Sequence, residues 1–195
     1  HWQSRLEFRN GALYIEPLYL ESAPQPITVN ASGVWNGRSQ RVDVDYMSYR
    51  HPGAGELTGF GTLGFKSGVI LEQSHLSLKA SELKVLSAIY MQPFLAGTAM
   101  EGFTLEGRLN AEISIVQQAL TECSLDFVQL NIDDSKGRFG LENGAGAIHW
   151  TSIEGASRPS DIAWRQLQFY NLPVGASKLS FSTQAKTIKL LEKAR

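Results

Sequence analysis

The sequence predicts an all-β protein with a minor α-helical part. Its long antiparallel strands are expected to form one strongly curved sheet, shaped as an apolar groove or half-barrel. The first observation is a strict alternation of apolar and polar residues from Phe103 to Ile115, which is typical of a strand with one dry face and one wet face. The second is that strand-like segments and turn residues recur at intervals of roughly 10 to 15 residues, as expected for all-β architectures.

The first part of the chain is expected to be a series of strands joined by tight turns. Residues 2–8 alternate and lead into Asn10-Gly11, a strong hairpin signal, so we expect them to be followed by a hairpin-linked second strand over residues 13–21. Pro17 interrupts that second strand, which makes it an edge strand or a bulged one. Further strands are expected over residues 27–35, 41–49, 56–65 and 69–78.

One short helix is expected near residues 82–92. Its apolar stripe consists of Leu83, Leu86, Ile89 and Tyr90. Ser81 is a suitable N-cap, and Pro93 cannot continue a helix, so we expect the helix to end just before it. Two roles are compatible with the stripe: a plug that packs on the sheet for stability, or a helix that closes one end of an apolar cavity.

The second part of the chain returns to the strand pattern. A hairpin turn is expected at Asn143-Gly144, and residues 186–195 fit an extension of the last strand as well as a helix. The expected strands cover residues 103–116, 120–132, 138–142, 144–152, 161–170 and 178–184.

The composition fits a single β-rich module over residues 1–195. A net charge of −1 gives no general attraction to nucleic acid, and no run approaches the roughly 18 apolar residues of a membrane span. Cys123 is the only cysteine, which excludes an internal disulfide framework and multi-cysteine zinc clusters. Because residues 2–8 already alternate, we expect the chain to be a fragment of a longer repeat protein.

No combination of residues predicts a catalytic centre, a metal site or a cofactor. Residues 59–64 match a G-x-G-x-x-G spacing, but a turn is expected after them instead of a helix, so glycines of a bent strand are the better interpretation. The four histidines lack ligand spacing, Asp133-Asp134 has ordinary turn composition, and Cys123 is expected to be a packed free thiol. We therefore expect no enzyme; the remaining enzyme hypothesis would use His51 or Asp133.

Several segments resemble the repeating β modules of the AsmA-like proteins, the group that includes TamB and YhdP of Gram-negative bacteria. The similar segments are residues 78–83, 90–97, 103–107, 130–142 and 147–150. The resemblance implies an elongated β-groove in the periplasm that is lined with apolar side chains. It brings no catalytic residues with it, because the family has none to transfer.

The resemblance also implies a function: a segment that binds or conducts phospholipids between the inner and outer membranes, within a full-length protein anchored in the inner membrane. Expected partners are phospholipid acyl chains and neighbouring β modules of the same longer chain. The expected groove lining is Phe103, Leu105, Leu109, Ile113 and Ile115, with Leu125 and Phe127 opposite. The residues alone leave an alternative open, a structural or protein-binding β-sandwich without a ligand, in which a second sheet covers the dry face.

Overall fold

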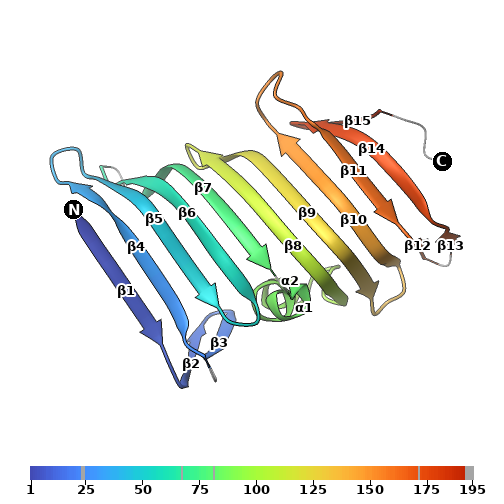
Figure 1. The fold of residues 1–195 in the computed structure, drawn as a ribbon, viewed down its shortest axis with the longest axis horizontal. Coiled ribbons are helices and arrows are strands. Elements are labelled where there is room, and N and C mark those ends of the chain that lie inside the picture. The colour runs from blue at the N-terminus through green and yellow to red at the C-terminus, as the bar shows by residue number, and fades with distance from the viewer. Residues whose placement is uncertain (23–24, 67, 81, 171, 192–195) are drawn as a thin grey trace.

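The computed structural model describes residues 1–22, 25–66, 68–80, 82–170 and 172–191. Over these residues the protein is mostly β-structure with one short helical segment, as the sequence predicts. Most strands belong to one large antiparallel sheet that does not close into a barrel (Figure 1). A separate two-stranded hairpin, β2–β3, lies at one end of this sheet.

The longest strands lie in the middle of the sheet. β8, β9 and β10 contain 14, 16 and 13 residues, more than twice the usual strand length of about 5–6 residues. The described strands are β1 (Trp2–Phe8), β2 (Gly11–Ile15), β3 (Leu18–Ser22), β4 (Ile27–Asn36), β5 (Arg41–His51), β6 (Gly55–Gly64), β7 (Ile70–Ala80), β8 (Phe103–Val116), β9 (Ala119–Asp134), β10 (Phe139–Thr151), β11 (Pro159–Trp164), β12 (Gln166–Phe169), β13 (Leu172–Val174), β14 (Ser177–Gln184) and β15 (Thr187–Leu190).

Strand order follows the sequence with few exceptions. β1 pairs with β4, each strand from β4 to β11 pairs with the next, and β11 pairs with β14. β12 and β13 form a side branch on β10, and β1 and β15 are the two edges of the main path. The helical segment, the β2–β3 hairpin and the β12–β13 branch all lie at the same end of the strands (Figure 1), which we call the helical end.

Cross-strand register sorts the side chains onto two different faces. Residues that pair directly across antiparallel strands point to the same face of the sheet. One such row, from β1 to β10, is Leu6, Val29, Tyr49, Leu57, Leu78, Ala111, Leu125 and Ile148. The neighbouring row points the opposite way and is polar: Arg50, Glu56, Lys79, Asn110 and Asp126. We call the two surfaces the apolar face and the polar face.

Glycines lie where neighbouring strands come too close for a side chain. A Cβ on Gly59 would lie 2.4 Å from the carbonyl oxygen of His75, and one on Gly61 would lie 2.7 Å from that of Gln73. Both glycines are inside β6, and the strand β7 follows them instead of a helix. A dinucleotide-binding loop needs a helix N-terminus at this point. The G-x-G-x-x-G spacing therefore belongs to a β-sheet with bulged strand pairs on either side.

The helical segment is longer than the sequence predicts. Its three parts are α1 (Leu83–Leu86), a π-helical turn η1 (Ser87–Met91) and α2 (Gln92–Leu95). The prediction that Pro93 stops the helix is wrong, because Pro93 lies in the first turn of α2, a position that proline tolerates. Glu82 occupies the N-cap position, and the expected cap, Ser81, lies outside the described residues.

The predicted helical stripe packs on the apolar face at the helical end. Leu83 is 2% exposed and Leu86 is 9% exposed, whereas Tyr90 is half-buried. Together with Ala54 and Ala80, the two leucines form the buried cluster beneath the helix. The segment thus packs on one end of the sheet, as both predicted roles require.

Two predicted hairpins are wrong. β1 does not pair with the strand after Asn10-Gly11; it pairs with β4, and the intervening residues fold as the β2–β3 hairpin with Pro17 in its turn. Asn143-Gly144 does not turn the chain either, because β10 runs through it as one strand with a bulge. Asn143 has φ 51°, a left-handed conformation that asparagine adopts more readily than most residues in bulges as well as in hairpin turns.

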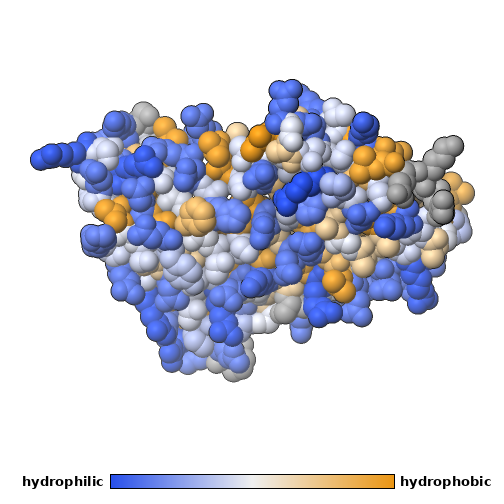
Figure 2. Space-filling view, turned by 45° about the horizontal axis from the view of Figure 1, so that its top comes forward, coloured by the Kyte–Doolittle hydropathy of each residue, from blue (hydrophilic) through white to orange (hydrophobic). Residues whose placement is uncertain are grey.

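The exposed surface is large for a chain of this size. It measures 12588 Å², whereas a compact protein of 21.5 kDa exposes about 9,200 Å². Hydrophobic side chains reach the surface over much of the length of the molecule (Figure 2). The only second sheet in the described residues is the two-stranded β2–β3 hairpin, so a two-sheet sandwich is not formed within this part of the chain.

Candidate functional site

The seven residues expected to line a groove lie on the apolar face. The odd-numbered positions of β8 from Phe103 to Ile115 are half-buried or buried, and the even-numbered positions from Thr104 to Glu112 are exposed. Across the β8–β9 pair, Leu109 faces Phe127, and Ala111 faces Leu125. The alternation in the sequence therefore places the side chains correctly, but it does not separate those that are covered by the helix from those that are not.

Part of the apolar face is covered. Leu105 and Leu109 pack against the buried cluster of Leu83 and Leu86, as does Leu130 of the neighbouring strand. We call this region the covered end. It is a small hydrophobic core of the usual kind, made between a helix and a sheet.

The rest of the apolar face lies farther along the same strands. Ile113, Ile115 and Leu125 do not belong to the cluster beneath the helix. Ile113 lies between Leu76 on β7 and Cys123 on β9, so its nearest partners are residues of the same sheet. We call this region the open face.

A polar contact holds the helix on the sheet at the covered end. The Tyr90 hydroxyl lies 2.6 Å from Nδ1 of His51 and also hydrogen-bonds the hydroxyl of Tyr49. Burial and the contact with Tyr49 raise the pKa of Tyr90, and burial lowers the pKa of His51. Both side chains are therefore neutral at pH 7. His51 is 6% exposed and is the last residue of β5, which extends beyond the strand predicted over residues 41–49.

A pocket of about 630 Å³ opens between the helical segment and the strands at the helical end. This volume is within the usual range of small-molecule sites, about 300–1,000 Å³. We call it the end pocket. It is lined by Ser87, Met91, Gln92, Leu95, Ala99, Met100, Phe103, Leu105, Ile132, Arg138, Phe139, Phe169 and Tyr170.

Only two of the predicted lining residues, Phe103 and Leu105, belong to the end pocket. Leu95 is absent from the predicted lining because the helix is expected to stop at Pro93, although its i, i+4 spacing from Met91 continues the apolar side of the helix. Phe139 and Phe169 come from strands that pair far apart in the sequence, and no local pattern brings them together.

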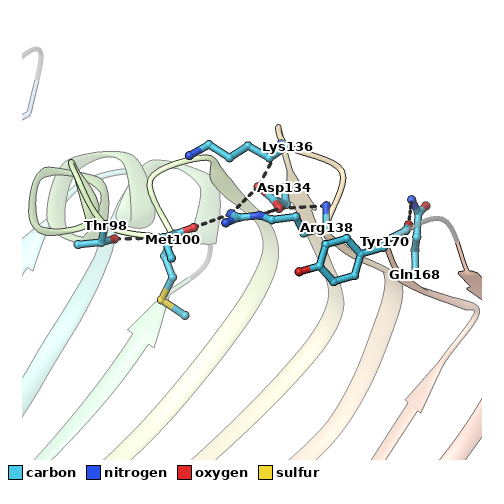
Figure 3. Close-up of polar contacts among 8 residues, drawn as sticks. Thr98, Met100, Asp134, Lys136, Arg138, Gln168 and Tyr170 are labelled. Atoms are coloured by element: carbon cyan, nitrogen blue, oxygen red, sulfur yellow. Dashed lines mark hydrogen bonds and ion pairs between the residues drawn. The ribbon is translucent and has the colours of Figure 1, made fainter.

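An ion pair fixes the mouth of the end pocket. The Arg138 guanidinium donates to both carboxylate oxygens of Asp134, at 2.6 and 3.1 Å, and to the carbonyl oxygen of Ala99 (Figure 3). The bond from Arg138, together with the backbone N–H groups of Lys136 and Arg138, lowers the pKa of Asp134 to about 2. Arg138 thus ties the connection after the helix to the β9–β10 turn, and the Asp134 carboxylate is fully occupied.

A second hollow carries charged side chains. It has a volume of about 830 Å³ and is lined partly by residues of the polar-face row and partly by Leu109 and Phe127 of the predicted groove lining. Its cations are Arg50, Lys79 and Arg108, and its carboxylates are Glu56 and Asp126. Because both signs of charge are mixed there, this hollow favours no class of charged ligand, and we place the candidate site on the apolar face.

The two residues of the enzyme hypothesis lie apart from the end pocket: His51 contacts Tyr90, and Asp133 is an exposed strand residue. Burial raises the pKa of the Cys123 thiol, the opposite of what an activated thiolate requires. Within the described residues, no group of three or more His, Cys, Asp or Glu side chains could hold a metal ion.

Comparison with known proteins gives no identity. No protein-family model matches the chain, and neither a curated protein nor a solved structure is significantly similar to it. None of the helices in the described part of the chain is long and apolar enough to cross a membrane.

Proposed function

We propose that the chain binds the acyl chains of phospholipids along its apolar face. In this proposal it is a periplasmic segment of an AsmA-like envelope protein that conducts phospholipids between the inner and outer membranes. The full-length protein would be anchored in the inner membrane, and neighbouring β modules would extend the surface.

The observation that carries the proposal is the continuous apolar row on a sheet that has no second sheet over it in the described residues. The row crosses eight strands, from Leu6 on β1 to Ile148 on β10. Tyr49 of this row bonds Tyr90 of the helical segment, and Leu78 packs against the buried cluster beneath the helix. A contiguous apolar surface that is only partly covered is typical of a binding site. The β-sandwich alternative requires a covering sheet, and the β2–β3 hairpin is too small to supply one.

Lipid binding also fits the absence of a sequence motif. Each buried methylene of an acyl chain contributes about 0.8 kcal/mol, so an apolar surface can hold a lipid without specific polar contacts. Such a site needs only apolar side chains at alternate positions, and β8 supplies them.

The test is native mass spectrometry of the protein after incubation with vesicles of phosphatidylethanolamine and phosphatidylglycerol. The wild-type protein is expected to carry phospholipid, and an Ile113→Asp variant is expected to lose it because the new carboxylate lies on the open face. Val116→Asp is the matched control, since Val116 is an exposed residue at an even-numbered position of the same strand. Circular dichroism checks that both variants are folded.

Two results would contradict the proposal. A wild-type protein that carries no phospholipid after incubation would contradict the proposed lipid binding altogether. Folded Ile113→Asp protein with the same lipid content as the wild type would show that the open face does not hold the lipid.

A further inference from the structure

The end pocket differs from the rest of the apolar face in being a bounded volume. Its walls come from three parts of the chain: the helical segment with its following turn and the start of β8, the end of β9 with the start of β10, and the end of β12 with Tyr170. Apart from Arg138, Gln92, Ser87 and the Tyr170 hydroxyl, its lining side chains are hydrocarbon or thioether. A bounded apolar volume suits one flexible chain better than a flat, extended surface does.

The mouth of the end pocket is open to solvent. Met100 is 51% exposed and Tyr170 is 67% exposed, yet both line the pocket. Phe103 and Phe139 lie deeper, with ring centroids 6.3 Å apart, and Phe139 in turn contacts Phe169 at 5.3 Å. A hydrocarbon chain that enters past Met100 and Tyr170 would therefore meet aromatic and aliphatic side chains.

The polar groups at the mouth are hydrogen-bond donors. Arg138 donates hydrogen bonds from Nε and one terminal nitrogen to Asp134 and Ala99. Its other terminal nitrogen, Nη1, has no hydrogen-bond partner among the described residues. The Tyr170 hydroxyl has none there either, and Figure 3 shows its ring beside Arg138. A guanidinium and a phenol favour a ligand head with acceptor oxygens, such as a carboxylate or a phosphate.

We infer that the end pocket binds a single acyl chain whose head group presents acceptor oxygens to Arg138 and Tyr170. This inference rests on the proposed lipid-binding function and adds a separate site to it. The hydrocarbon chain occupies the space between the helical segment and β8 to β10, and the head group remains at the solvent-exposed mouth.

The direct test uses hexadecanoate as the probe and isothermal titration calorimetry as the measurement. Ala99→Trp places an indole in the pocket while keeping the backbone carbonyl that Arg138 binds, so binding should weaken at least tenfold, about 1.4 kcal/mol. Ala96→Trp is the matched control: Ala96 is also exposed, lies in the same connection and does not line the pocket. Equal binding by the two variants would overturn the inference.

The head group is tested with a conservative change. Tyr170→Phe removes one donor and keeps the ring, so binding of hexadecanoate should weaken about tenfold, as expected for a lost hydrogen bond to a charged acceptor. Binding of hexadecylamine, which has the same chain and a cationic head, should be weak in the wild-type protein and unchanged by Tyr170→Phe. If the two probes bind equally well, the assignment of the head group is wrong.

Phospholipid loading separates this inference from the proposed function. Ala99→Trp protein is expected to carry phospholipid after vesicle incubation while it fails to bind hexadecanoate. If the wild-type protein carries phospholipid and Ala99→Trp binds hexadecanoate normally, only the end pocket is wrong. A wild-type protein that binds neither lipid overturns both.

Discussion

Leu109 and Ile113 lie on the same face of β8 but have different surroundings. Leu109 is nearer the helical end, and Ile113 lies farther along the strand. Leu109 packs under the helix with Leu83 and Leu86, whereas the neighbours of Ile113 are residues of the same sheet, Leu76 and Cys123. The covered end has a core of the usual kind. The open face has the same residue types without a covering layer in the described residues.

The difference shows that alternation alone does not distinguish a core from a binding surface. Both positions satisfy the same period of two, because alternation reports only that one face avoids water. Whether protein or a ligand covers that face depends on another segment, here residues 83–95. Variants at the two positions can therefore separate the two environments.

The largest expected effect is on folding, at the covered end. Leu109→Asp would place a carboxylate against Leu83 and Leu86 beneath the helix and should destabilise the fold by roughly 4 kcal/mol, at the upper end of single-substitution effects. Ile113→Asp should destabilise it much less, because the carboxylate can reach water on the open face. Urea unfolding followed by circular dichroism measures both. Equal destabilisation would show that the open face is covered as well.

The next effect concerns the packing of the helical segment on the sheet. Leu86→Ala is expected to reduce the free energy of unfolding by about 2–5 kcal/mol, the range for a leucine truncated in a packed core. Phe94→Ala is the control on the same helical segment, since Phe94 is 58% exposed and such changes usually stay within about 0.5 kcal/mol. Similar losses for the two variants would contradict the assignment of the buried stripe.

The polar contact beneath the helix should contribute less than the leucines do. Tyr90→Phe removes a hydroxyl and leaves His51 Nδ1 and the Tyr49 hydroxyl without their partner, which should cost about 1–3 kcal/mol. Tyr46→Phe is the control, because Tyr46 is an exposed residue of the same strand as Tyr49. If the free energy of unfolding is the same for the two variants, the helix does not depend on this contact.

The sequence supports the fold class and the side of β8 on which each residue lies, because both follow from local alternation. It does not reveal the pairing of β1 with β4, since the hairpin signal at Asn10-Gly11 acts only on adjacent residues. Pro93 misleads for a related reason: proline is excluded from a helix interior but accepted in a first turn, and a π-helical turn before it creates that first turn. The end pocket depends on Phe139 and Phe169, whose proximity arises from sheet topology.

The smallest expected effect is a dependence of the covered end on pH. Burial holds the pKa of His51 below its ordinary value of about 6.5, so the unfolded chain binds a proton at His51 more readily than the folded one. The free energy of unfolding should therefore be constant above pH 6.5 and should fall as the pH drops below it, by at most about 1.4 kcal/mol per pH unit for one proton. Urea midpoints between pH 8 and pH 5 measure this slope, and His51→Gln should reduce it. An unchanged slope in His51→Gln would show that acid acts elsewhere, and the helix at the covered end would then be insensitive to the protonation of His51.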